Sequence, residues 1–255
     1  MAAWFEVVED CCSRFNPDSE LSSLNRDPQE EIPVSALLGE VLEAGDRAYS
    51  LSRGLVDPTV LEAVAAAGYD RDFSSARRRP AATPGRVEGW DRVRVQGDRV
   101  VRPPGVGIDL GGIAKGWTAE RALELIDGPA LIDAAGDIAA RGPWMIDVQH
   151  MGELVARLLI RDLGVATSGI DRRAWPGGHH LIDPRTRLPA RTDVVVATVA
   201  AEDTPTAETV ARTVLLMGRR DGLAWAESLH EVKAALVTTV SGAVLAIPRS
   251  EEVLL

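Results

Sequence analysis

The sequence predicts an α+β fold with a mixed or antiparallel sheet. Strand-like segments outnumber helical ones along the 255 residues, and several follow one another in hairpin order. This order favours helices packed on a mixed or antiparallel sheet over a doubly wound parallel sheet. A hydrophobic content of 45% is enough to bury one large domain or two small ones, and no linker-like stretch separates two halves.

The helical pattern appears in five segments. Residues 2–13 are helical in pattern and run into the turn signal Asn16-Pro17-Asp18-Ser19. Residues 35–52 carry apolar side chains at helical spacing and are expected to end near Gly54, a residue suited to a C-cap. The remaining predicted helices are 115–126, 206–217 and 220–228.

The strand pattern begins with a hairpin. Residues 93–96 and 100–102 alternate apolar and polar side chains around Gly97-Asp98. Further strand-like runs are 130–133, 144–148, 154–159, 194–199, 234–239 and 243–247. Residues 75–88 are rich in Arg, Pro and Ala without periodicity, so they are expected to form a surface loop.

Charge and termini exclude several functions. The net charge of -10 repels phosphate backbones, which argues against a general nucleic-acid binder. The first residues fit neither a signal peptide nor a lipoprotein anchor, and no apolar stretch is long enough to span a bilayer. We therefore expect a cytoplasmic protein. The adjacent Cys11 and Cys12 are expected to form neither a disulfide with each other nor a zinc cage.

A glycine-rich segment precedes the helix predicted at 115–126. Gly111 and Gly112 let backbone N–H groups approach a phosphate at a helix N-terminus, and Asp109 and Lys115 add an acceptor and a cation. A tight strand-to-helix turn explains the same glycines equally well.

Two further segments place carboxylates beside turns. His180 and Asp183 stand just before a proline-bearing turn, where they are suited to act as a base and its orienting partner or to hold a metal-bound ligand. A solvated surface loop is the competing interpretation. Asp57 precedes Pro58, and an N-cap with proline at the first helical position accounts for both.

The last candidates are hydroxyl and charged side chains. Thr167 and Ser168 stand at a strand end between glycines, and Glu208 and Arg212 share a helix face, where an ion pair alone explains their spacing. Motifs of serine hydrolases, zincins and thioredoxins are absent from the sequence.

The order of these segments resembles one family, the FAD:protein FMN transferases, also called the ApbE family. The matching pieces span nearly the whole chain and are SRFNPDSELSSLN, GLVDPTV, IDLGGIAKGW, ALIDAAGDI, VATSG, HLIDPRTRLPA and TAETVARTVLLMG. Several motifs in the same order are far more specific than any single one.

The resemblance implies a fold, an activity and a set of ligands. It implies a single α+β domain of T-fold type over residues 1–255, and binding of FAD and a divalent metal, usually Mg²⁺. The implied reaction moves FMN from FAD onto a threonine hydroxyl of an acceptor flavoprotein, and AMP leaves.

The same resemblance assigns roles residue by residue. His180 and Asp183 match the essential histidine and its aspartate partner. Gly112, through its carbonyl, and Glu208 fall at metal-ligand positions. The positions implied to contact FAD are Phe15, Asp57, Asp109, Gly111, Gly112, Lys115, Thr167 and Ser168.

The chain departs from the family pattern at three places. Glu208 and Arg212 stand where the family carries Asp and, four residues on, Thr. An arginine has no lone pair for a metal, so one expected ligand is missing or replaced, and Arg212 is suited instead to contact a phosphate. Arg187 stands where glycine is favoured, and Ala135-Gly136 replaces a glycine pair.

Two other functions fit the same residues. An FAD pyrophosphatase would use water in place of threonine and yield FMN and AMP. A protein whose altered Glu208 and Arg212 helix has removed catalysis would bind FAD without turnover.

Overall fold

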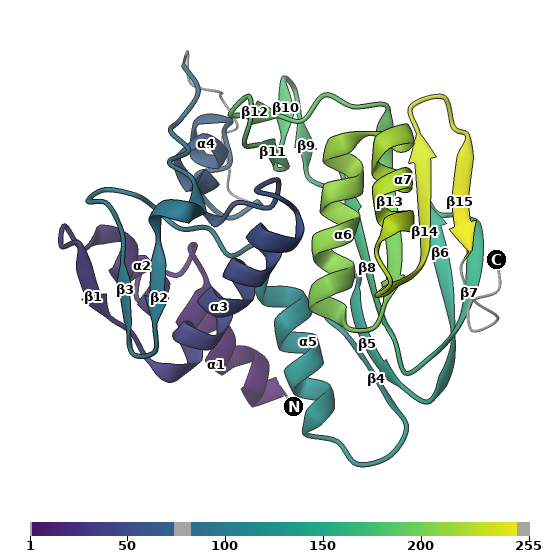
Figure 1. Ribbon diagram of the computed structural model, residues 1–255, viewed down its shortest axis with the longest axis horizontal. Helices are drawn as coiled ribbons and strands as arrows, with labels where there is room; N and C mark the ends of the chain where they lie inside the picture. Colours follow the sequence, from purple (N-terminus) through teal and green to yellow (C-terminus); the bar gives the residue numbers. More distant parts are fainter. Residues whose placement is uncertain (1, 74–82, 249–255) are drawn as a thin grey trace. The chain divides into compact units, whose positions relative to one another are not determined.

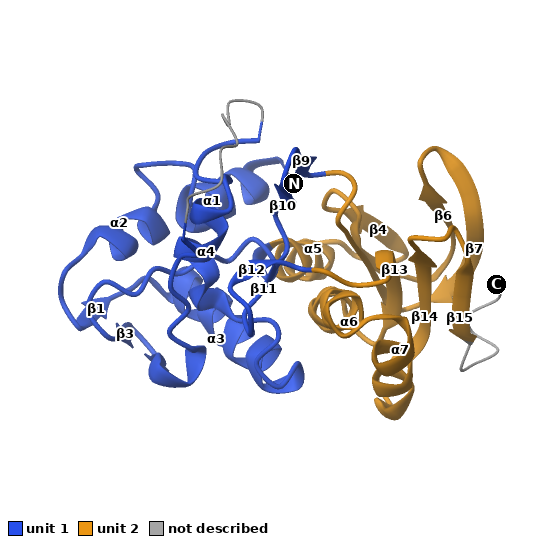
Figure 2. Ribbon diagram, turned by 90° about the horizontal axis from the view of Figure 1, so that it is seen from above, with its two compact units in different colours: residues 1–114, 173–190 blue, residues 115–172, 191–255 orange. Residues whose placement is uncertain are grey.

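The computed structural model describes residues 2–73 and 83–248 and has an α+β fold, as predicted. The chain divides into two compact units, coloured separately in Figure 2. Unit 1 comprises residues 1–114 and 173–190, and unit 2 comprises residues 115–172 and 191–255.

Unit 1 is mainly helical. Its elements are α1 (Ala2–Cys12), α2 (Glu20–Arg26), α3 (Ala36–Leu51), the 3-10 turns η1 (Pro58–Val60) and η2 (Trp90–Arg92), and α4 (Leu61–Ala66). Helix α3 begins because the Ser35 hydroxyl accepts the Leu38 N–H, and after it ends the Gly54 N–H bonds the Tyr49 carbonyl at 2.8 Å. Helices at 2–13 and 35–52 are therefore confirmed.

Small sheets complete unit 1. Strands β1 (Glu31–Pro33), β2 (Arg94–Gln96) and β3 (Arg99–Val101) form an antiparallel sheet in the order β1-β3-β2, which contains the predicted hairpin. The returning segment 173–190 forms two short ladders, β9 (Ala174–Trp175) with β10 (Gly178–His179) and β11 (Ile182–Asp183) with β12 (Leu188–Pro189). Trp175 and Ile182 pack with Ala67 and Tyr69 in one buried cluster, which attaches this segment to the helices of unit 1.

Unit 2 is built on one six-stranded antiparallel sheet (Figure 1). Its order is β15-β14-β13-β8-β5-β4, and every neighbouring pair is antiparallel. The strands are β4 (Ala130–Asp133), β5 (Asp137–Arg141), β8 (Gly164–Gly169), β13 (Val194–Ala201), β14 (Val232–Thr239) and β15 (Val244–Pro248).

Different elements cover the two faces of this sheet. Helices α6 (Thr204–Met217) and α7 (Arg219–Ser228) pack on one face, α6 along β8 and β13 and α7 along β14. The hairpin β6 (Pro143–His150) with β7 (Glu153–Arg161) covers the other face through an apolar cluster that includes Leu158, Ile160 and Val165. Helix α5 (Ala114–Glu124) precedes β4.

Most predicted elements are present, and the missed ones are short. The predicted helices of residues 115–126, 206–217 and 220–228 correspond to α5, α6 and α7, and each predicted strand lies within two residues of an observed one. Helix α2, seven residues long, was not predicted, and β5 was missed beside its hairpin partner. Residues 83–88 contain no helix or strand, as expected, whereas residues 75–82 of the predicted loop lie outside the described residues.

Two departures from the family pattern coincide with left-handed backbone. Ala135 has φ +59° in the turn between β4 and β5, and Arg187 has φ +62° after the DPRT segment. Glycine adopts this conformation without the steric cost that a Cβ atom brings. The family's preference for glycine at these two positions therefore has a conformational reason.

In the part of the chain that the structure describes, helices long and apolar enough to cross a membrane are absent. Cys11 and Cys12 are both buried and form no disulfide.

Candidate active site

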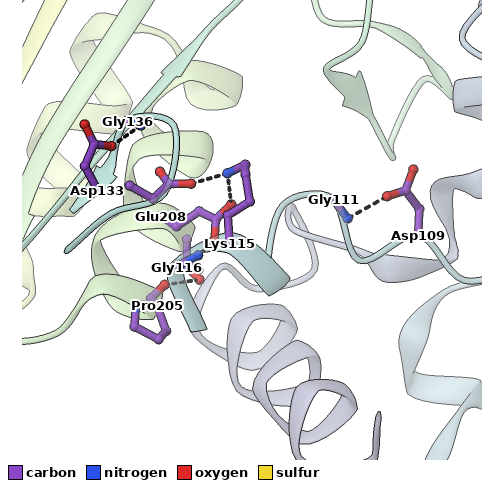
Figure 3. Close-up of polar contacts among 10 residues, drawn as sticks. Asp109, Gly111, Lys115, Gly116, Asp133, Gly136, Pro205 and Glu208 are labelled. Atoms are coloured by element: carbon purple, nitrogen blue, oxygen red, sulfur yellow. Dashed lines mark hydrogen bonds and ion pairs between the residues drawn. The ribbon is translucent and has the colours of Figure 1, made fainter. Parts of the chain in front are cut away.

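A buried cluster of charges lies in unit 2, at the start of α5 (Figure 3). The Lys115 ammonium bonds the Asp137 carboxylate and, at 2.8 Å, Oε1 of Glu208. The side chains of Asp137 and Glu208 are each only 3% exposed, whereas that of Lys115 is 34% exposed. One partly exposed cation therefore bridges two buried anions.

Three elements bring these side chains together. Lys115 and Gly116 stand in the first turn of α5, Asp137 is the first residue of β5, and Glu208 lies on the second turn of α6. Side chains alternate along a strand, and Ile138 faces the hairpin, so Asp137 faces α6. The Gly116 N–H donates to Oε2 of Glu208 at 3.0 Å, and a Cβ atom at position 116 would lie 2.8 Å from that oxygen. A larger residue there would displace the Glu208 carboxylate from the Gly116 N–H.

The ionisation of this cluster follows from burial and mutual charge. Burial opposes the charged form of Lys115, but Glu208 and Asp137 outweigh it and raise the lysine pKa. Burial and the charge of Glu208 raise the pKa of Asp137 to about 7, against the opposing charges of Lys115 and Arg212. The positive charge of Arg212 thus favours the ionised form of Asp137. The buried Nε of Arg212 has no hydrogen-bond partner among the described residues.

In unit 1, Asp109 is held by a buried arginine. Nε of Arg14 lies 2.9 Å from Oδ2 of Asp109, and the two side chains are 9% and 11% exposed. The Gly111 N–H donates to Oδ1 of Asp109 at 2.7 Å (Figure 3). The guanidinium also lies over the rings of Phe15 and Tyr69, at 4.1 and 4.7 Å from their centroids. The ion pair with Asp109 and the two aromatic rings therefore hold the Arg14 guanidinium in one position.

Asp57 lies next to this group in unit 1. The Asp109 N–H donates to the carbonyl of Pro58 at 2.8 Å. Oδ1 of Asp57 accepts both the N–H and the hydroxyl of Thr59 at 2.8 Å, which makes Asp57 the N-cap of η1. Burial raises the pKa of Asp57, and the Thr59 hydrogen bonds oppose that rise. The expected cap is confirmed.

The two adjacent histidines differ in their surroundings. The His179 ring accepts the Leu181 N–H at Nδ1 and lies 3.0 Å from the Ala190 carbonyl at Nε2, so its proton is on Nε2. Burial lowers the pKa of His179. The His180 ring is half-buried and stands edge-on to Tyr69, 6.3 Å between centroids. His179 is therefore a structural residue, and His180 belongs to the aromatic group around Tyr69.

The Asp183 carboxylate pairs with Arg185, two residues later in the chain. The carboxylate accepts the Arg185 backbone N–H at 2.9 Å and pairs with that guanidinium at 2.7 Å. The Arg187 N–H bonds the Asp183 carbonyl at 2.7 Å, which closes the turn. Asp183 thus organises the turn that follows His180.

The hydroxyls of β8 point to opposite faces of the sheet. Thr167 is exposed, and its Oγ1 lies 2.9 Å from that of Thr198 on β13. Ser168 is buried, 8% exposed, and by alternation faces the same side as Asp137.

The structure links some of the predicted site residues and adds others. It joins Phe15, Asp57 and Asp109 in unit 1, and Lys115 with Glu208 in unit 2. Glu208 pairs with Lys115 and not with Arg212, so the ion pair offered to explain their spacing is wrong.

Three contributors were not predicted: Arg14, Tyr69 and Asp137. Arg14 and Asp137 stand inside quoted motifs, SRFNPDSELSSLN and ALIDAAGDI, so their position was the available signal. Tyr69 is brought to the cluster only by tertiary packing.

Comparison of the sequence with known proteins identifies its family. The family model described as the ApbE family matches residues 1–236. The chain is 27% identical to an FAD:protein FMN transferase of Vibrio cholerae over 93% of its length and 78% of that protein.

Solved structures agree with this match. The structure resembles flavin transferase ApbE from Vibrio cholerae with a TM-score of 0.81 at 25% identity, covering 98% of this chain and 86% of the other. It resembles the ApbE protein from Thermotoga maritima with a TM-score of 0.82 at 26% identity, covering 98% and 88%.

Proposed function

Because this chain belongs to the ApbE family, we propose that it is an FAD:protein FMN transferase. The observation that carries the proposal is the family match over residues 1–236, together with relatives of that name aligned over most of both chains. The substrate is then FAD, and the acceptor is a flavoprotein with an accessible threonine.

The reaction exchanges one phosphorus–oxygen bond for another. The threonine oxygen bonds the phosphorus of the FMN half of FAD, and the bond from that phosphorus to the bridging oxygen breaks. AMP leaves with the bridging oxygen, and the threonine proton passes to a base. Such a reaction requires positive charge or N–H donors near the phosphates and a base near the hydroxyl.

Residues of this chain are assigned to those tasks as part of the proposal. His180 takes the threonine proton, and Asp183 holds the turn that follows His180. Lys115 supplies positive charge to the phosphates, and the N–H groups of Gly111 and Gly112 act as donors. Flavin and nucleotide contacts are assigned to the family positions Phe15, Asp57, Asp109, Thr167 and Ser168.

Magnesium, which the family implies, does not fit the residues of unit 2. Glu208, the expected ligand, already accepts Lys115 and the Gly116 N–H, and Arg212 stands at the second ligand position. Over the described residues 2–73 and 83–248, groups of three or more His, Cys, Asp or Glu able to hold a metal are absent. No step of the proposed reaction is assigned to a metal, and Gly112 keeps only its role toward FAD.

The transfer is tested by intact-mass analysis. The purified chain is incubated with FAD and a candidate acceptor flavoprotein, and we expect a mass increase of FMN minus water on the acceptor, with one AMP for each adduct. An acceptor whose target threonine is changed to valine is the control. An acceptor that never gains mass while FAD stays intact would contradict the proposal.

A second experiment tests the base. His180→Ala is expected to slow transfer by roughly 10²–10⁴-fold because general-base catalysis contributes about that much. His179→Ala is not a suitable control, since the His179 ring bonds two backbone groups. Instead, an unfolding curve followed by circular dichroism, compared with that of the parent, should show that His180→Ala retains the native fold. Near-normal transfer would remove His180 from the mechanism.

The same assay separates the other two functions. Release of AMP and FMN without any acceptor indicates an FAD pyrophosphatase. FAD that co-purifies and is never cleaved indicates a binding protein. The single domain over residues 1–255 and the cytoplasmic location stay predictions, which limited proteolysis and cell fractionation would test.

A further inference from the structure

The charged cluster of unit 2 contains its own counter-charges. Two carboxylates, Asp137 and Glu208, are matched by two cations, Lys115 and Arg212. We propose that Lys115 and Arg212 replace the family's divalent cation, so that this chain binds the pyrophosphate of FAD without a metal. The inference rests on the proposed function, since FAD is the ligand, and it goes beyond that function by assigning the source of the positive charge.

The carboxylates have few free positions for a metal. Oε1 of Glu208 accepts the Lys115 ammonium at 2.8 Å, and Oε2 accepts the Gly116 N–H at 3.0 Å. Asp137 also bonds the ammonium. A divalent cation at these oxygens would have to displace Lys115, and it would bring two positive charges next to the charge of Arg212. The cluster as built therefore disfavours a dication.

Arg212 has the chemistry to bind a phosphate. It lies one turn after Glu208 on α6, and its positive charge acts on Asp137. Its buried Nε has no acceptor among the described residues, although a buried donor is normally satisfied. A planar guanidinium matches phosphate oxygens with two parallel hydrogen bonds. A phosphate oxygen of the ligand is an acceptor of the kind that this donor lacks.

The substitution at position 212 is chemically coherent with the lysine bridge. The family's threonine would offer an oxygen to a metal, whereas arginine offers only donors and a fixed charge. Lys115 already pairs with both buried carboxylates that a metal would otherwise contact. Lys115 thus pairs with the protein's carboxylates and presents a partly exposed ammonium to the phosphates, and Arg212 adds a second positive charge for the ligand.

The first test measures the metal directly. Mn²⁺ is titrated into the full chain, and the signal of free Mn²⁺ is followed by electron paramagnetic resonance, without FAD and with it. We expect no stoichiometric loss of the free signal in either titration. Binding of one Mn²⁺ per chain with micromolar affinity would overturn the inference.

The second test measures FAD affinity by flavin fluorescence, in EDTA and in millimolar Mg²⁺. We expect dissociation constants that agree within about twofold between the two conditions. In EDTA, Arg212→Gln should weaken FAD binding by about tenfold or more, and Arg212→Lys should restore part of it, because a buried charge-assisted phosphate contact contributes on that scale.

Arg157→Gln is the matched control. It removes the same charge from unit 2 at the β6–β7 hairpin, where Arg157 is 59% exposed and pairs with Asp147. We expect it to change FAD affinity by less than twofold. An equal loss in both variants, or no loss in Arg212→Gln, would overturn the role of Arg212.

The outcomes separate this inference from the proposed function. FAD binding that requires Mg²⁺ overturns the inference and leaves the transferase intact. Failure of FAD to bind under both conditions overturns the proposed function and the role of Arg212 together, while the Mn²⁺ titration still decides whether the cluster excludes a metal.

Discussion

Arg14→Met is expected to destabilise the protein strongly by leaving Asp109 buried without its cation. The two side chains are 9% and 11% exposed, and removing one member of a buried pair costs about 3–5 kcal/mol. The Gly111 N–H still donates to Asp109, so we place the loss of the pair at about 3 kcal/mol, the lower end of that range. The lost stacking on Phe15 and Tyr69 adds roughly 1 kcal/mol.

The assay is a double-mutant cycle with Asp109→Asn. Urea unfolding is followed by circular dichroism and by tryptophan fluorescence, and coincident transitions justify a two-state free energy. We expect a coupling of about 2–3 kcal/mol between Arg14 and Asp109. The exposed pair of Arg157 and Asp147 serves as the reference cycle, with an expected coupling below about 1 kcal/mol. Equal couplings in the two cycles would refute the reasoning from burial.

Two further predictions concern backbone strain and pH. Ala135→Gly and Arg187→Gly should each raise the free energy of unfolding by roughly 0.5–1 kcal/mol. Left-handed backbone costs a residue with a Cβ atom about 1–2 kcal/mol, and the larger backbone entropy that glycine loses on folding offsets part of the gain. Thermal unfolding measures the change, and a lowered melting temperature in both variants would be evidence against strain. Burial lowers the pKa of His179, so the unfolded chain binds a proton that the folded chain refuses. The stabilising contribution of neutral His179 should be fully present above the ordinary histidine pKa and should fall as the pH drops from about 7 to 5. The His179→Asn variant should therefore lose less free energy of unfolding over that interval than the parent. A variant with the same pH dependence as the parent would assign the acid sensitivity to other groups.

The fold was largely predictable because its longer elements carry clear periodicity. Helix α3 has a serine N-cap, a buried apolar face and a glycine after its end, all readable in the sequence. Helix α2 was missed because seven residues hold too few apolar positions to show a period, and its N-cap Ser19 was assigned to a turn. Strand β5 was missed because its apolar residues are mostly alanine, and its partner β8 follows only after the β6–β7 hairpin.

The candidate site was predictable as motifs but not as contacts. The sequence placed Glu208 and Arg212 on one helix face, but it contained no signal that Lys115, 93 residues away, would take Glu208 as its partner. The same holds for Arg14, whose charge is engaged by Asp109 through the packing of unit 1. Contacts of this kind depend on tertiary structure, whereas caps such as Asp57 depend on residues two positions away.

The interrupted path of the chain through unit 1 has a consequence during synthesis on the ribosome. Residues 1–114 emerge first, yet Trp175 and Ile182, which close their apolar cluster beside Ala67 and Tyr69, lie beyond residues 115–172. The core of unit 1 therefore stays incomplete until residues 115–172, about half of unit 2, have been translated. A nascent chain stalled before residue 173 should expose Tyr69 to chaperones and proteases, and no stop codon placed at the end of residue 114 can yield a complete unit 1.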